Sequence, residues 1–137
     1  MRTAYFSLLI VLLVCTCGRA DENKAGTSAD DTTVAVPAAP YQDLGPLDFA
    51  ERMGDPNAVL LDVRTPAEIA NGKIDGALEI DYRSPDFARR IGELDTTKTY
   101  LVYCASGGRS SQTCERMAAA GFGKLYNLKG GYSAWRQ

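Results

Sequence analysis

The strongest constraint on the fold is an apolar segment that ends abruptly at a cysteine. Residues 99–103 form an almost continuous apolar run, and Cys104 follows directly. Small residues and two glycines come next, and Arg109 and Ser110 open a segment with helical spacing. A short apolar run between turn signals is typical of a strand buried on both faces of a parallel sheet. The pattern therefore predicts a strand, a tight loop and a helix, with a thiol at the base of the loop.

Short apolar runs and amphipathic stretches alternate along the rest of residues 41–137. Strands alternating with helices require right-handed crossovers between parallel strands. We therefore predict an α/β fold, with a mostly parallel central sheet of about five short strands and helices on both faces. The helix expected to start near Pro46 and stop near Gly54 has Leu47, Ala50 and Met53 spaced for one apolar face.

Cys104 is the candidate nucleophile of the predicted loop. Amides of successive small residues can all point inward and, with the amino end of the following helix, stabilise negative charge. A cysteine in such a place has a depressed pKa, and the thiolate is the reactive form. We expect Gly107 and Gly108 to adopt conformations that side chains disfavour and to leave room for a ligand.

The chain contains no histidine. This excludes a Cys-His protease or acyltransferase and any metal site that needs imidazole, and no metal site is predicted. The formal net charge is -2, so there is no basic excess of the kind that nucleic-acid binding requires. Sulfur transfer onto and off a thiolate fits these limits, because it needs no proton shuttle.

The loop Cys104-Ala105-Ser106-Gly107-Gly108-Arg109-Ser110 resembles the C-x-x-G-x-R-S active loop of the rhodanese-like sulfurtransferases, with four residues between cysteine and arginine. The resemblance runs from Tyr41 to Gln137 and includes three further matches in the family's order. These are the stretches 60–68, 72–77 and 127–131, the last followed by Trp135. The sequence departs from the family at Lys73-Ile74-Asp75, where His-Ile-Pro is common, in a segment that we interpret as a connection.

The resemblance implies a thiosulfate sulfurtransferase that works through a persulfide on Cys104. A donor such as thiosulfate gives up its outer sulfur, sulfite departs, and cyanide or a thiol accepts the sulfur. The substrate-binding residues implied are those of the loop: Ala105, Ser106, Gly107, Gly108, Arg109 and Ser110. No cofactor is implied, and a protein acceptor is left open.

Three charged residues outside the loop are candidates for supporting roles. Asp62 and Arg64 lie at the carboxyl end of a strand predicted over residues 58–63; we expect Asp62 to accept from loop amides and Arg64 to pair with a carboxylate such as Glu68. Lys129, before two glycines, would add positive potential near the loop. Within the loop, Arg109 is expected to act on the thiolate or on a substrate anion.

Cys114 could suggest a disulfide or a resolving thiol. It shares helical spacing with Ser110, Met117 and Gly121, which places these residues on one face. We therefore expect Cys114 to pack against the sheet, and Trp135 to be a packing residue as well.

Two other functions compete with this interpretation. A cysteine-based phosphatase or arsenate reductase has the same strand-loop-helix layout, but its loop places five residues between cysteine and arginine. A rhodanese-like module that binds a partner or carries persulfide without catalysis is the other alternative, although an inert module would tolerate loss of its cysteine.

Residues 1–17 have the features of a signal peptide, with Arg2 before an apolar run from Ala4 to Val14. The Cys15-Thr16-Cys17-Gly18 stretch resembles a bacterial lipoprotein processing site, with Cys17 as the acylated residue. Cys15 competes for this role, and ordinary cleavage or an uncleaved anchor are alternatives. Residues 18–40 lack apolar periodicity and are predicted to be a flexible linker. We thus expect an exported domain, 41–137, lipid-anchored to a membrane in the cell envelope or periplasm.

Overall fold

The computed structural model describes residues 39–137. The predicted signal peptide, Cys17 and the linker up to residue 38 lie outside the described residues, so these expectations stay predictions. Within the described part, no helix has both the length and the apolar character needed to cross a membrane.

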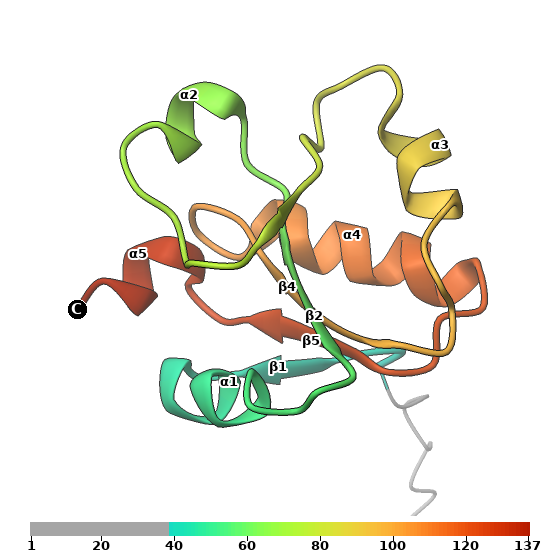
Figure 1. The fold of residues 1–137 in the computed structure, drawn as a ribbon, viewed down its shortest axis with the longest axis horizontal. Helices are drawn as coiled ribbons and strands as arrows, with labels where there is room; N and C mark the ends of the chain where they lie inside the picture. Colours follow the sequence, from blue (N-terminus) through green and yellow to red (C-terminus); the bar gives the residue numbers. More distant parts are fainter. Residues whose placement is uncertain (1–38) are drawn as a thin grey trace, which may run out of the picture. The chain divides into compact units, whose positions relative to one another are not determined.

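A five-stranded sheet forms the centre of the domain, with the order β1-β5-β4-β2-β3 (Figure 1). All of its strand pairs are parallel. The strands are β1 (Gln42–Leu44), β2 (Ala58–Asp62), β3 (Leu78–Glu79), β4 (Thr99–Tyr103) and β5 (Leu125–Leu128). The predicted α/β class and the parallel sheet are confirmed.

Helices cover both faces of this sheet, as predicted. They are α1 (Pro46–Arg52), α2 (Pro66–Ile69), α3 (Phe87–Gly92), α4 (Gly108–Ala119) and α5 (Gly131–Trp135). Side chains of α3 and α4 pack with one face of the sheet in one buried cluster, and those of α1 and α5 pack with the other face in a second. Figure 1 shows α1 and α4 on opposite sides of the sheet.

The amino-terminal part of the domain differs from the prediction. Residues 42–44 form an edge strand that pairs with β5, although three mostly polar residues gave no strand signal. The predicted apolar face of α1 is wrong: Leu47 is 87% exposed, and Phe49 is the buried residue. Phe49 meets the Trp135 ring edge-on at 6.3 Å, and this contact, which sequence spacing cannot reveal, selects the face.

Local signals in the middle of the chain are confirmed more closely. The segment Thr65-Pro66-Ala67-Glu68 has the residue types and spacing that predict a capping box at the start of a short helix. Thr65 and Glu68 form this box at the start of α2, each side chain accepting from the other's backbone amide. Ser84-Pro85, followed by Phe87 and Ile91 at helical spacing, predicts a helix that opens at Ser84. The helix begins only at Phe87, but Phe87 and Ile91 are buried as this spacing predicts. The connection at residues 73–75, where the sequence departs from the family pattern, is held to the sheet. The amide of the buried Ile74 donates to the Tyr103 hydroxyl at 3.1 Å.

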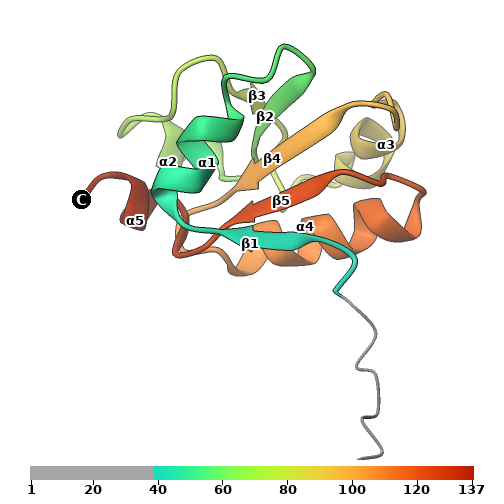
Figure 2. The ribbon, with the colours of Figure 1, turned by 90° about the horizontal axis from the view of Figure 1, so that it is seen from below.

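The register of the sheet determines where the functional residues meet. β4 lies between β2 and β5, all five of its residues are buried, and Tyr103 is paired with Asp62. The carboxyl ends of parallel strands lie at one edge, where ligands of open α/β sheets bind. The residues after β2, β4 and β5 therefore converge at that edge, and Figures 1 and 2 both place α2, α5 and the start of α4 there.

Candidate active site

Cys104 lies at the carboxyl end of β4 with only 1% of its surface exposed. The Gly107 amide donates a hydrogen bond to its Sγ at 3.1 Å, and the Ser110 hydroxyl lies 3.5 Å from the same sulfur. Ser110 Oγ is also 3.0 Å from the Gly107 carbonyl oxygen. Donors of the loop and of the first turn of α4 thus face the thiol, as the sequence predicts.

These hydrogen-bond donors lower the pKa of the Cys104 thiol. Burial raises the pKa of Cys104, but hydrogen bonds from the Ser110 hydroxyl and from the amides of Ser110, Ser106 and Gly107 lower it, and the net pKa lies below its usual value. Hydrogen bonding to the charged form can outweigh desolvation when several donors converge. Because the thiolate is the attacking species, this geometry favours a nucleophilic sulfur.

The two glycines of the loop differ in backbone conformation and in the space available for a side chain. Gly107 precedes α4 with φ +98°, and an added Cβ would lie 3.2 Å from the Gly130 amide nitrogen. Gly108 has no positive φ, and an added Cβ would meet open space. The expectation of a conformation that side chains disfavour is therefore wrong for Gly108, which is already the first residue of the helix.

The start of α5 is a part of the site that the sequence analysis did not identify. The Tyr132 amide donates to the Cys104 carbonyl oxygen at 2.7 Å, and the Ser133 amide to the Ala105 carbonyl oxygen at 3.0 Å. Gly131, at φ +59°, has no room for a side chain, because a Cβ would lie 2.5 Å from the Cys104 carbonyl oxygen. The paired glycines 130 and 131 were the only signal of this close approach.

Asp62 and Arg64 form a buried pair with each other. Arg64 Nη2 lies 2.6 Å from Asp62 Oδ2, and Arg64 Nε lies 3.0 Å from both carboxylate oxygens. The Arg64 amide donates to Asp62 at 2.9 Å, as expected for Asp62. Arg64 pairs with a nearby carboxylate as predicted, but this carboxylate is Asp62 and not the suggested Glu68. Two charges this buried are tolerated when they are paired and hydrogen-bonded, as here.

Arg64 also holds the surroundings of Cys104 together. Its Nη2 donates to the Gly72 carbonyl oxygen at 3.0 Å, and its guanidinium lies 4.2 Å from the Tyr132 ring centroid. The pair thus connects the end of β2 with α5, which contacts the Cys104 backbone. This geometry fits a supporting role rather than contact with the sulfur.

Arg109 is paired with Glu68 at distances of 2.9 Å and 2.5 Å. This hydrogen bond from Arg109 lowers the pKa of Glu68 to about 2. The guanidinium is therefore held by a carboxylate, and its expected role on the thiolate or on a substrate anion stays a prediction. Glu68 also accepts from the Thr65 amide at 3.0 Å, so α2 positions the carboxylate for both partners.

Lys129 and Cys114 are the two remaining residues that the sequence singles out. Lys129 is exposed, and its backbone amide donates to the Leu44 carbonyl oxygen at 2.9 Å, next to the glycine pair. Cys114 is fully buried in the cluster beneath α4, as predicted, and burial raises its pKa to about 12. Among residues 39–137 no group of three acidic, histidine or cysteine side chains could hold a metal ion.

A depression of about 240 Å³ opens beside the loop. Its lining comes from α2, the loop and α5: Arg64, Glu68, Asn71, Ala105, Tyr132, Ser133 and Arg136. Cys104 itself is covered, but the next residue, Ala105, forms part of the wall. A small molecule in this depression would therefore lie against the loop that surrounds the sulfur.

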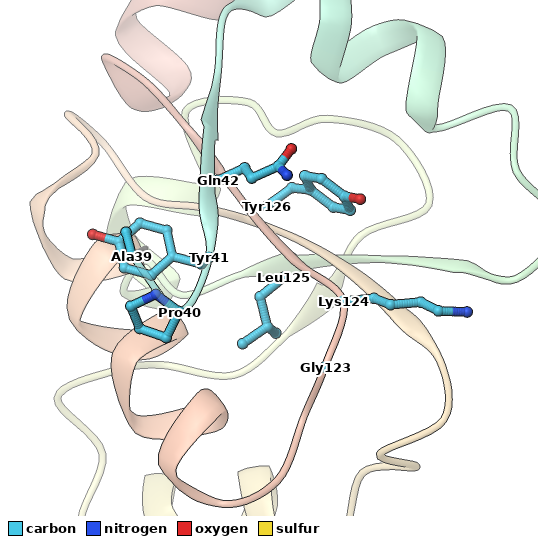
Figure 3. Close-up of a pocket in the computed structure, with 8 residues that line it drawn as sticks. All are labelled: Ala39, Pro40, Tyr41, Gln42, Gly123, Lys124, Leu125 and Tyr126. Carbon is cyan, nitrogen blue, oxygen red and sulfur yellow. The ribbon is translucent and has the colours of Figure 1, made fainter. Parts of the chain in front are cut away.

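A second pocket lies where β1 begins beside the loop into β5 (Figure 3). It is lined by Ala39, Pro40, Tyr41, Gln42, Gly123, Lys124, Leu125 and Tyr126. Figure 3 shows the Tyr41 and Lys124 side chains pointing in opposite directions, so they do not converge on one ligand. This pocket is at the amino end of the parallel strands, away from Cys104.

Comparison with known proteins identifies similar sequences and folds. The family model of the rhodanese-like domain matches residues 46–137. A sulfurtransferase of Allochromatium vinosum is 40% identical over 88 residues, which cover 64% of this chain and 80% of that protein. The thiosulfate sulfurtransferase GlpE of Stutzerimonas stutzeri is 35% identical over 92 residues, covering 66% and 82%. The crystal structure of a rhodanese-related protein from Thermoplasma volcanium superposes with a TM-score of 0.62 at 27% identity, covering 70% of this chain and 91% of that one.

Proposed function

Because the chain belongs to the rhodanese-like domain family, we propose that it is a sulfurtransferase that carries sulfur as a persulfide on Cys104. The observation that supports this most directly is the 3.1 Å hydrogen bond from the Gly107 amide to Cys104 Sγ, with the Ser110 hydroxyl on the same atom. These donors stabilise an ionised sulfur in a chain that has no histidine to activate it. The relatives named sulfurtransferase support the same reaction class.

Thiosulfate is the donor we propose. The Cys104 thiolate attacks the outer sulfur, a new S–S bond forms, and the bond to the sulfite sulfur breaks with its electron pair leaving on sulfite. The persulfide anion is stabilised by the loop amides, as the thiolate is. Cyanide or a thiolate then attacks the outer sulfur, and Cys104 leaves as a thiolate ready for another cycle.

The structure favours this reaction over phosphate or arsenate chemistry. A tetrahedral oxyanion needs a wide ring of donors and a cation directed into it, and four residues separate Cys104 from Arg109. The Arg109 guanidinium is instead bound to Glu68. The shorter ring suits a single sulfur atom.

The test is mass spectrometry of the reduced, purified protein after exposure to thiosulfate. We expect one added sulfur, located on Cys104, and release of one equivalent of sulfite. A parallel assay with thiosulfate and cyanide should give thiocyanate over many cycles, and an aryl phosphate should not be hydrolysed. A persulfide that forms but turns over with neither cyanide nor thiols would favour the non-catalytic carrier.

We also propose that the domain is exported and lipid-anchored through Cys17, on the support of the sequence pattern at residues 1–18. Metabolic labelling with a fatty acid should mark the wild-type chain and the Cys15→Ser variant but not Cys17→Ser. Label retained in Cys17→Ser and lost in Cys15→Ser would assign the anchor to Cys15 instead.

A further inference from the structure

We infer that Arg136 binds the carboxylate of a small anionic thiol that accepts the sulfur from Cys104. This inference rests on the proposed function and concerns the acceptor step only. It follows from the charges, the position and the size of the depression beside the loop.

The charged side chains that line the depression differ in their pairing. Arg64 is bound to Asp62, and Glu68 is bound to Arg109. Arg136 is exposed, and no carboxylate of residues 39–137 lies within 4.0 Å of its guanidinium. With the two pairs neutralised, the depression carries one uncompensated positive charge. It therefore favours an anionic ligand.

Arg136 is connected to the nucleophile through a single residue. Its guanidinium lies 5.7 Å from the ring centroid of Tyr132, whose amide donates to the Cys104 carbonyl oxygen at 2.7 Å. The other guanidinium near this ring is that of Arg64, which is neutralised by Asp62. Because Ala105 of the loop, Tyr132 and Arg136 all line the depression, a ligand there can contact both the loop and the free guanidinium.

The size of the depression suits an acceptor better than the donor. Its volume of about 240 Å³ is below the range of roughly 300–1,000 Å³ that holds drug-sized ligands, so a molecule of a few carbon atoms fits. Thiosulfate is compact, and its reacting sulfur must reach Cys104. A thiol with its carboxylate several bonds away can instead place sulfur at the loop and charge at Arg136.

The acceptor step balances without a further reactant. The thiolate of the acceptor attacks the outer sulfur of the Cys104 persulfide and forms a new S–S bond. The bond between Cys104 Sγ and the outer sulfur breaks, and its electron pair stays on Cys104 as the thiolate. The product is the persulfide of the acceptor, held meanwhile through its carboxylate by Arg136.

The experiment measures discharge of the preformed persulfide by two thiols in the Arg136→Gln variant. The purified full-length chain is loaded with thiosulfate, freed of donor, and mixed with either 3-mercaptopropionate or the uncharged 2-mercaptoethanol. The rate constant for 3-mercaptopropionate should fall about 5-fold, and that for 2-mercaptoethanol should stay within about 2-fold of wild type, as expected for one partly exposed ion pair. Arg136→Lys should restore part of the preference, and added salt should reduce it.

Arg116→Gln is the matched control, because Arg116 is an exposed arginine of α4 that lies over the Tyr82 ring at 5.0 Å and does not line the depression. It should leave both rate constants unchanged. Equal rate constants for R136Q and wild type with 3-mercaptopropionate, or an equal fall with both thiols, would overturn the role of Arg136. Failure of thiosulfate to load Cys104 in the wild type would overturn the proposed function itself, and is detected by mass before any thiol is added.

Discussion

Cys104 and Cys114 are two buried thiols of one packed cluster, and their pKa values are shifted in opposite directions. Cys104 is 1% exposed and Cys114 is fully buried, and both lie on the same side of the sheet. Donors of the loop and of α4 lower the pKa of Cys104, whereas burial raises that of Cys114 to about 12. Burial alone therefore does not decide the chemistry of a cysteine; the number of donors directed at the sulfur does.

The largest expected effect comes from exchanging each thiol for a hydroxyl. Cys104→Ser should abolish persulfide formation and thiocyanate production, because serine provides no ionised sulfur to attack the donor. Cys114→Ser should keep most of the activity and lose about 1–2 kcal/mol of stability, since a hydroxyl is placed in an apolar cluster. Mass spectrometry of the sulfur-loaded protein and unfolding followed by circular dichroism test both variants. Equal loss of activity in two folded variants would break the contrast between the thiols.

The second-largest effect is expected at Gly131, which packs closely against the backbone of Cys104. Gly131→Ala places a methyl group 2.5 Å from the Cys104 carbonyl oxygen at a φ of +59°, so the loop must move. A displacement of about 1 Å at a reacting atom can lower a rate about 100-fold, and we expect a loss of that order in sulfur transfer. Gly108→Ala is the control, because its Cβ meets open space. Comparable activity of the two variants would show that α5 does not hold the loop.

Removing one donor should have a smaller effect, visible in the pH dependence of alkylation. Ser110→Ala removes the hydroxyl that lies 3.5 Å from Cys104 Sγ and should raise the pKa of this thiol. The rate of iodoacetamide labelling of Cys104 should then rise with pH at a higher midpoint than in wild type. Cys114 should stay unlabelled in both folded proteins. An unchanged midpoint would mean that the backbone amides alone stabilise the thiolate.

The two thiols should also affect stability in opposite pH ranges. A lowered pKa in the folded state means that the Cys104 thiolate adds stability that is fully present above its unfolded pKa and is lost as pH falls through its folded pKa. For Cys114 the folded pKa is raised, so its contribution is lost as pH rises from about 9 toward 12. Cys114→Ala should therefore reduce the alkaline loss of stability in chemical unfolding, and Cys104→Ala should not.

The smallest expected effect comes from the ion pair between Arg109 and Glu68. Glu68→Gln weakens the pairing with Arg109, and we expect it to cost about 1 kcal/mol of stability and to change sulfur loading less than 3-fold. Because Arg109 lowers the pKa of Glu68 to about 2, the wild type should lose this contribution as pH falls from about 4.5 to 2. A loss of sulfur loading as large as that of Gly131→Ala would instead place Arg109 in direct contact with the reacting groups.

Local patterns predicted the part of the site that one segment builds. The apolar run 99–103, Cys104 and the small residues after it were enough to predict the strand, the loop and donors facing the sulfur. The capping box at Thr65 and Glu68 was predicted for the same reason. Local patterns did not predict which of the two loop glycines is required. At Gly107 a side chain would approach the Gly130 amide nitrogen, and Gly130 is distant in sequence.

The sequence by itself determined the α/β class, the identity of the candidate nucleophile and the exclusion of imidazole chemistry, since each depends on residue type and on spacing within one segment. The tertiary structure alone decided which charges pair, which face of α1 is buried and how α5 supports Cys104. Arg109 binds Glu68 because the parallel register brings the ends of β2 and β4 together, although the two residues are 41 positions apart in the chain. Arg64 binds Asp62, two positions away, and folding decides only that this carboxylate, and not Glu68, is its partner.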